Sequence, residues 1–349
     1  MKLLKETLER IDDLDVELMK KAQDRIDNLV KPKGSLGKLE SLAIQVSGIK
    51  GEMFPKTDNK AIIVMASDHG VCQEGVASAP QSVTEFQSYN ISQGKTGVCA
   101  LASIAGADIV TVDLGVMVDL KSEKILNKKV MYGTNNMTKG PAMTFEEAVR
   151  GLEVGIEVTE GEIKKGRNII ATGEMGIGNT TPSTAILSVL GGYAPSEITG
   201  VGANLPREKI ENKIRVIEKA IEVNNPDKND PLDVLSKVGG LDIAGMAGTM
   251  LACAANKVPC IVDGYISTAA GLIACALEPK TKNYLISSHF SKEKGAAAAS
   301  NLLGIEPMLD MGMRLGEGSG AALVFNIVDS AVAVNRQMIT FQEAGIGVV

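Results

Sequence analysis

The sequence predicts an α/β fold in which a mainly parallel sheet carries helices on both faces. Short apolar runs rich in Ile and Val recur along the chain, and each ends in a polar or Gly-rich tip. Such continuous runs are typical of strands buried on both faces. Segments with helical spacing of apolar residues separate them, and this alternation favours a parallel sheet. Ligands of such sheets bind at the carboxyl ends of the strands, where the polar tips lie.

The N-terminal region is expected to be helical. In residues 3–29 apolar side chains such as Leu4, Leu8 and Ile11 recur at steps of three and four residues, which predicts one amphipathic helix. Pro32 and the glycines after it end that helix. Residues 39–49 predict a second helix, which ends near Gly51.

The alternating part of the chain follows. Strands are expected within residues 60–70, 107–116, 167–181, 258–267 and 283–291, with a weaker candidate at 196–206. Helices are expected at 146–165, 207–223, 242–255 and 320–337. The terminal helices lie outside the alternation, so we expect them to form a small helical domain from residues 1–50 and 327–349. Residues 51–326 would then form the large α/β domain.

The composition of the 349 residues excludes several classes of protein. The chain has 36 basic and 42 acidic residues and a net charge of −6, with no Trp, 6 Phe and 5 Tyr. An acidic chain with few aromatics is not expected to bind nucleic acid. Its two His exclude a His-rich metal site, so we expect no metal, although a mixed-ligand site stays open.

Three further features predict a cytoplasmic location. No charge-free apolar stretch reaches the roughly 18 residues of a membrane span. Charges interrupt the N-terminus at once, so no signal peptide is expected. Five Cys without a CxxC spacing are typical of buried thiols in a reducing compartment.

One candidate site is the Gly-rich turn in GEMGIGNTTPSTAI (173–186). Asn179 and Thr180 can cap the helix that follows. A Gly-rich turn that opens a helix can cradle an anion, because several N–H groups and the helix dipole point at one place. The spacing matches neither a Walker motif nor GxGxxG. A tight turn without a ligand is the alternative, and the motif alone does not decide between them.

A second Gly-rich turn, GEGSGAAL (316–323), opens the last long helix and carries Glu317 between two glycines. A carboxylate there can simply compensate the helix dipole. If the turn faces a pocket, Glu317 can instead act as a general base. Asp263 ends another predicted strand. The residues alone therefore indicate an acidic α/β protein that binds a phosphorylated small molecule, by a reaction that they leave open.

Seven segments of the chain, read together, resemble the nicotinate-nucleotide–dimethylbenzimidazole phosphoribosyltransferase family. The resemblance extends over about residues 30 to 345, and the combination of motifs is highly specific although each is weak alone. The segments are KPKGSLGKLE (31–40), SDHGV with EGV (67–76), GEMGIGNTT (173–181), VGANLP (201–206), DVLSKVGGLDIAGMAG (233–248), IVDGYISTAA (261–270) and MRLGEGSGAAL (313–323).

The resemblance implies a transfer of phosphoribose from nicotinate mononucleotide to dimethylbenzimidazole, which gives α-ribazole phosphate and nicotinate. Glu317 matches the general base of the family. The resemblance further implies a Rossmann-like large domain, no cofactor, and a dimer with shared active sites. The residues expected to bind substrate are Glu174, Gly176, Asn179, Thr180, Gly202, Lys213, Asp263, Ser291, Leu315, Gly318 and Gly320, with Pro80 and Phe86 near the acceptor.

The chain departs from the family pattern after EGV. The family usually continues with a Ser-Ala-Tyr-Pro-like segment and then a Gln that lines the acceptor pocket, whereas this chain reads ASAPQSVTEFQ (77–87). The sequence places Ala79, Pro80 and Phe86 there, so the acceptor pocket is expected to be less polar or differently shaped.

Three alternative functions stay open. Some relatives pair two homologous subunits and use phenol or p-cresol as the acceptor, and this chain could do the same. A nicotinamide-dependent oxidoreductase also fits a parallel sheet with Gly-rich turns, although GxGxxG is absent. The third alternative is a partner subunit that binds a nucleotide without catalysis.

Overall fold

A computed structural model describes residues 1–347. It contains a six-stranded sheet in which all neighbouring strands are parallel, in the order β3-β2-β1-β4-β5-β6. The predicted α/β class with a parallel sheet is confirmed. The strands are β1 (Lys60–Ser67), β2 (Ala107–Gly115), β3 (Ile125–Asn127), β4 (Ile169–Met175), β5 (Cys260–Val262) and β6 (Leu285–Ser287).

The strand order reverses direction between β1 and β4. The chain passes from β1 outward to β2 and β3 on one side, and from β4 to β5 and β6 on the other. Open α/β sheets form a ligand crevice at the carboxyl ends of the strands where this reversal occurs. Met65 of β1 lies opposite Glu174 of β4, and Ala66 lies opposite Met175. The register therefore brings SDHG and GEMGIG side by side at this edge.

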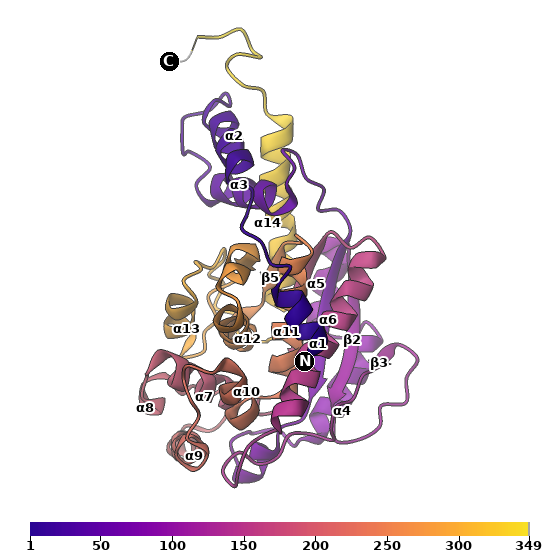
Figure 1. Ribbon diagram of the computed structural model, residues 1–349, viewed down its shortest axis with the longest axis vertical. Coiled ribbons are helices and arrows are strands. Elements are labelled where there is room, and N and C mark those ends of the chain that lie inside the picture. The colour runs from indigo at the N-terminus through magenta and orange to yellow at the C-terminus, as the bar shows by residue number, and fades with distance from the viewer. Residues whose placement is uncertain (348–349) are drawn as a thin grey trace.

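Helices cover both faces of the sheet (Figure 1). Side chains of β1 alternate between two cores: Ile63 and Met65 pack in one, Ile62 and Val64 in the other. The α-helices are α1 (Lys2–Leu8), α2 (Val16–Asp27), α3 (Lys38–Lys50), α4 (Ser82–Ser92), α5 (Gly97–Ala105), α6 (Phe145–Lys164), α7 (Thr180–Gly191), α8 (Pro195–Ile198), α9 (Ile210–Asn224), α10 (Pro231–Val238), α11 (Leu241–Ala255), α12 (Gly264–Leu277), α13 (Ala296–Leu303) and α14 (Ser319–Gln337).

The first core lies between the sheet and the helices α6 and α11. The second lies between the sheet and α5 and α14. Three short 3-10 turns complete the secondary structure, at Gly70–Glu74, Arg207–Lys209 and Pro279–Tyr284. None of the helices within residues 1–347 is long and apolar enough to cross a bilayer.

The N-terminal region differs from the expectation of one helix over residues 3–29. It forms two helices, α1 and α2. Asp15 caps the start of α2, where its carboxylate accepts a hydrogen bond of 2.9 Å from the N–H of Leu18. Helix α1 lies against α6, where the N–H of Leu4 donates to Glu153 at 3.3 Å.

Helices α2 and α3 lie beside α14 (Figure 1). The guanidinium Nε of Arg25 in α2 donates to the carbonyl of Asn335 in α14 at 3.0 Å. The division into two domains at residues 50/51 and 326/327 stays a prediction. Residues 348–349 of the expected small domain lie outside the described residues.

Residues 196–206 are not a strand. They form the end of α8 and a turn, in which Leu205 donates its N–H to the carbonyl of Val201 at 2.9 Å. The strands expected at 258–267 and 283–291 are also shorter than predicted, with three residues each. Helix α12 begins at Gly264, directly after Asp263, so most of the polar tip of β5 is helical.

Candidate active site

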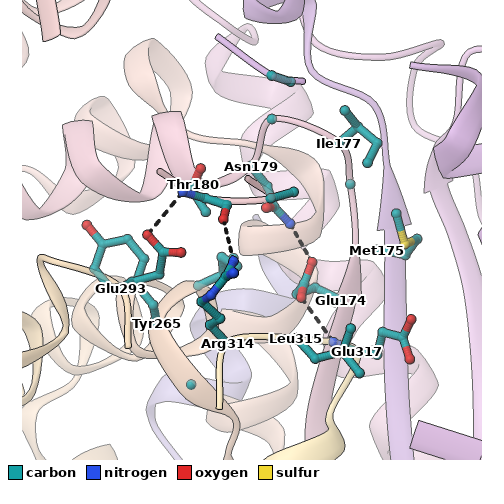
Figure 2. Close-up of a pocket in the computed structure, with 18 of the residues that line it drawn as sticks. Glu174, Met175, Ile177, Asn179, Thr180, Tyr265, Glu293, Arg314, Leu315 and Glu317 are labelled. Atoms are coloured by element: carbon teal, nitrogen blue, oxygen red, sulfur yellow. Dashed lines mark hydrogen bonds between the residues drawn. The ribbon is translucent and has the colours of Figure 1, made fainter. Parts of the chain in front are cut away.

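A cavity of about 300 Å³ opens at the carboxyl edge of the sheet, where the strand order reverses. Its walls come from segments that are far apart in the sequence (Figure 2). They are residues 76–78, Val83 and Gln87 of α4, residues 174–180, residues 201–203, residues 263–266, His289, Ser291, Glu293 and residues 314–317.

Glu317 is held at one end of this cavity by two hydrogen bonds to its carboxylate. Oε1 accepts from the side-chain amide of Gln87 at 3.0 Å, and Oε2 accepts from the N–H of Val98 at 3.3 Å. Val98 lies in the first turn of α5, so its donor belongs to the N-terminus of that helix. The side chain is buried, with 5% of its surface exposed. The carboxylate is therefore fixed in orientation.

The turn that carries Glu317 has a strained, left-handed backbone. Gly316, Glu317 and Gly318 have φ angles of 85°, 65° and 98°. A positive φ is uncommon for a residue with a side chain. The turn also packs against β4, because a Cβ on Gly173 would lie 2.4 Å from the carbonyl oxygen of Glu317. Only glycine fits at position 173 without displacing the turn.

Two carboxylates of the protein accept hydrogen bonds from the backbone N–H groups of this turn. Glu174 Oε1 accepts from the N–H of Glu317 at 3.1 Å. Asp263 accepts from the N–H of Gly318 at 3.1 Å and from the N–H of Ala321 at 2.9 Å. Burial raises the pKa of Asp263, although His289 and these donors oppose the shift. The N–H groups of Glu317, Gly318 and Ala321 are therefore paired within the protein and are not open to an anionic ligand.

Gly318 and Gly320 lie outside the lining of the cavity. A Cβ on Gly320 would lie 1.9 Å from Nδ1 of His289, and one on Gly318 would lie 2.7 Å from the side chain of Ile62. Both glycines are required by close packing behind the turn. The structure therefore gives them a packing role at positions where the sequence predicted substrate contact.

Glu174 lies at the centre of the cavity and is buried (Figure 2). Burial raises the pKa of Glu174 to about 8, and the nearby charge of Asp242 adds to the shift. The side-chain amide of Asn179 donates to Glu174 and, at 3.1 Å, to Asp242. The sequence predicts that Asn179 caps α7 with its side chain. It stands at the N-cap position, but its amide is committed to these two carboxylates.

At the other end of the cavity Arg314 lines the wall, and Lys213 lies behind Thr180. The ammonium of Lys213 donates to Thr180 Oγ1 at 2.7 Å and to the carbonyl of Gly200 at 3.3 Å. Burial lowers the pKa of Lys213 to about 8. Arg314 donates to the carbonyl of Gly202 at 3.2 Å, and the N–H of Gly202 donates to Glu293 at 3.3 Å (Figure 2).

Most of the residues predicted to bind substrate come together around this cavity. Their contact with a substrate stays a prediction. Those that line the cavity are Glu174, Gly176, Asn179, Thr180, Gly202, Asp263, Ser291, Leu315 and Glu317. Lys213 lies behind Thr180 and touches it.

Pro80 and Phe86 do not line the cavity. Pro80 is exposed, and Phe86 is 68% exposed on α4. The next residue, Gln87, points inward and bonds Glu317. The expected departure from the family pattern is therefore wrong at this position, because Gln87 lines the cavity where the sequence predicted Phe86. The sequence reasoning also missed Arg314, Glu293 and His289. Arg314 could have been found from its charge beside the Gly-rich turn, whereas the other two carry no comparable signal.

Known proteins are similar to this chain over nearly its whole length. The family profile described as phosphoribosyltransferase matches residues 11–346. A protein of Alkaliphilus metalliredigens (strain QYMF), named nicotinate-nucleotide–dimethylbenzimidazole phosphoribosyltransferase, is 59% identical over 99% of both chains. A protein of the same name from Clostridioides difficile (strain 630) is 48% identical over 99% of this chain and 100% of its own.

A solved structure shows the same fold. The crystal structure of the nicotinate-nucleotide–dimethylbenzimidazole phosphoribosyltransferase from Thermus thermophilus matches with a TM-score of 0.91. It is 35% identical, and the match covers 96% of this chain and 100% of that chain. The predicted resemblance is confirmed, and this chain belongs to the nicotinate-nucleotide–dimethylbenzimidazole phosphoribosyltransferase family.

Proposed function

We propose that this chain transfers the phosphoribosyl group of nicotinate mononucleotide to dimethylbenzimidazole, with inversion at the anomeric carbon. The products are α-ribazole phosphate and nicotinate. One observation carries the proposal: a buried carboxylate, Glu317, faces the cavity while both of its oxygens are held by donors. A base in this position suits an acceptor that must lose a ring N–H proton as it attacks.

The surroundings of Glu317 suit a flat aromatic acceptor. Val83, Met175, Ile177 and Leu315 line the cavity with apolar side chains. Figure 2 places Met175 and Leu315 near Glu317, with Glu174 on the side toward Arg314. An apolar wall with one polar group at its edge binds such a ring and fixes its orientation.

The other end of the cavity suits the nucleotide. Lys213 supplies a positive charge, and Thr180 begins α7, whose N-terminus favours an anion. Arg314 lies on the same side (Figure 2). A phosphate there would direct the ribose toward Glu174 and leave its anomeric carbon between the two ends.

The chemical step then needs a single proton transfer. One nitrogen of dimethylbenzimidazole forms a bond to the anomeric carbon, while the N–H proton of the other nitrogen passes to the carboxylate of Glu317. The bond from the anomeric carbon to nicotinate breaks, and its electron pair neutralises the pyridinium ring. Attack on the face opposite nicotinate converts the β configuration to α. The positive ring of the substrate activates its own departure.

Dimethylbenzimidazole is the proposed acceptor, and phenol or p-cresol is the alternative to be tested. The choice is supported by the names of the two relatives, which match this chain over nearly its whole length. We further infer that the chain forms a homodimer and needs no homologous partner subunit. The segment 31–40, which carries part of the family resemblance, lies with α2 and α3 (Figure 1) and contributes no residue to the lining of the cavity of its own chain. In a dimer it could serve the partner's site.

The test is an acceptor panel with the purified chain alone. Nicotinate mononucleotide is incubated with dimethylbenzimidazole, phenol or p-cresol, and the products are identified by mass spectrometry and NMR. We expect α-ribazole phosphate and released nicotinate, with slower transfer to the phenols. Faster transfer to phenol contradicts the acceptor, and no transfer without a second chain contradicts the single-subunit proposal. Sedimentation of the same sample tests the homodimer.

A further inference from the structure

Behind Glu174 lies a network of buried polar side chains that the proposed reaction does not use. His69 Nε2 lies 3.3 Å from Oδ2 of Asp242, and the same oxygen accepts from the amide of Asn179 at 3.1 Å. Asn179 also donates to Glu174. His69 and Asp242 are completely buried. The network therefore extends from the end of β1, through the first turn of α11 and the turn before α7, to β4.

The packing around this network leaves its side chains little room to move. A Cβ on Gly176 would lie 2.8 Å from Nε2 of His69, and one on Gly240 would lie 2.4 Å from its Cε1. The imidazole is therefore enclosed by the backbone at two glycines. Asp242 is fixed further, because its Oδ1 accepts the N–H of Ile243 at 2.9 Å. Nδ1 of His69 has no hydrogen-bond partner among residues 1–347.

The side chains of this network differ in their electrostatic surroundings. Burial favours a neutral imidazole, but the carboxylate of Asp242 outweighs it, and the pKa of His69 is raised; Asp68 and Glu174 add to the effect. His69 is therefore the basic partner of Asp242. Within residues 1–347 no basic side chain pairs with Glu174 in this way. Glu174 faces Asp242 and Asp263, and the turn of Glu317 approaches it with a backbone N–H.

We propose that His69 and Asp242 are positioning residues for Glu174: Asp242, balanced by His69 and linked through Asn179, keeps Glu174 protonated so that it donates a hydrogen bond to the bound nucleotide. Each oxygen of Glu174 accepts one hydrogen bond within the protein. A protonated carboxyl still has one O–H to donate. Glu174 lines the cavity, so that donor can reach a substrate oxygen.

The proposal rests on the proposed function, because it assigns a role toward the nucleotide. It also explains how the cavity accepts an anionic substrate. Asp263, Glu293 and Glu317 already line it. An ionised Glu174 would repel the phosphate and carboxylate of nicotinate mononucleotide, whereas a neutral Glu174 attracts them through its O–H.

Infrared spectroscopy tests the proposal directly, because protonated and ionised carboxyl groups absorb at different frequencies. The band of Glu174 is the one that Glu174→Gln removes from the wild-type spectrum. We expect it at neutral pH, with a titration midpoint of about 8. Asp242→Asn removes the neighbouring negative charge and should move the midpoint down by about one pH unit. The matched control is Asp113→Asn, a buried aspartate of β2 that pairs with Lys129 and should leave the midpoint in place.

Nicotinate mononucleotide binding gives a second measurement. At about pH 8, Asp242→Asn should bind it about 3- to 10-fold more weakly than the wild type, and the difference should vanish near pH 6. A midpoint unaffected by Asp242→Asn overturns the proposal. If that variant does not fold, the wild-type protein still decides, because a spectrum in which Glu174→Gln removes no protonated band at neutral pH also overturns it.

The state of His69 can be measured without ambiguity, since the chain has only two His. In nitrogen-15 NMR of histidine-labelled wild type, assigned with His289→Gln, His69 should be doubly protonated at neutral pH. A neutral His69 overturns its role as the balancing charge. The infrared and NMR results do not depend on turnover. A wild-type protein that forms no α-ribazole phosphate would therefore contradict the proposed function and leave the protonation of Glu174 to be decided separately.

Discussion

The side-chain amide of Gln87 donates a hydrogen bond of 3.0 Å to Oε1 of Glu317. It joins α4 to the turn before α14, although the two residues are 230 positions apart in the sequence. The second oxygen of Glu317 accepts from the first turn of α5. The carboxylate therefore has one orientation, which two helices set. Replacing Glu317, the proposed base, and replacing Gln87, which holds it, should have different effects.

Replacement of the base itself is the first prediction. Glu317→Gln keeps the shape of the side chain but cannot accept the acceptor's proton. We expect nicotinate mononucleotide to bind as before and turnover to fall by roughly two to four orders of magnitude. Calorimetry and single-turnover kinetics measure the two quantities. Unchanged turnover would exclude Glu317 as the general base.

Replacement of its support is the second prediction. Gln87→Leu removes the donor to Oε1 and leaves a buried carboxylate with one hydrogen bond fewer. A hydrogen bond to a charged group contributes about 1.5–3 kcal/mol, so we expect kcat to fall about 10-fold or more, with little change in the KM for nicotinate mononucleotide. The control is Gln93→Leu, at the exposed end of the same helix. An equal loss in both variants would indicate damage to α4 instead.

The third prediction concerns the glycine under the turn. In Gly173→Ala the new Cβ would lie 2.4 Å from the carbonyl of Glu317 and 3.0 Å from the side chain of Val64. The turn must move, so we expect a 10-fold or greater loss of kcat and a destabilisation of about 1–3 kcal/mol. Gly161→Ala is the matched control, because nothing lies within 4 Å of its new Cβ in α6. It should keep full activity and stabilise the helix by up to about 1 kcal/mol. Full activity of Gly173→Ala would mean that the turn adapts.

The periodicity of the sequence predicted most of the sheet and its class, because buried parallel strands are continuous apolar runs. It missed β3, which has three residues and no such run. It also joined α1 and α2, since the link between them keeps the helical spacing and only the cap at Asp15 breaks it. The Gly-rich turns were found because their composition is local.

Long-range pairing explains the parts of the site that the sequence could not supply. The donors at residues 318–321 look open in the sequence, but Asp263 meets them from the end of β5, 55 residues before Gly318. Likewise, Phe86 and Gln87 are neighbours on one helix, and only the packing of α4 decides which of them faces inward. His69 and Asp242 are 173 residues apart, so no local pattern joins them.

The last prediction follows from the buried carboxyl of Glu174, whose pKa is raised from an ordinary value of 4.5 to about 8. Between these values the folded protein holds a proton that the unfolded chain has released. The free energy of unfolding contributed by this group therefore falls as the pH rises, by up to about 1.4 kcal/mol per pH unit, and levels off above about 8. Glu174→Gln is neutral at every pH and removes this loss. We expect its Tm relative to the wild type to rise steadily from about pH 5 to about pH 8 and then to stay constant, as measured by thermal unfolding across that range. Asp113→Asn serves as the control, because a general effect of removing a buried acid would give the same slope in both variants. A Tm difference for Glu174→Gln that does not change with pH would mean that Glu174 is already ionised in the folded protein.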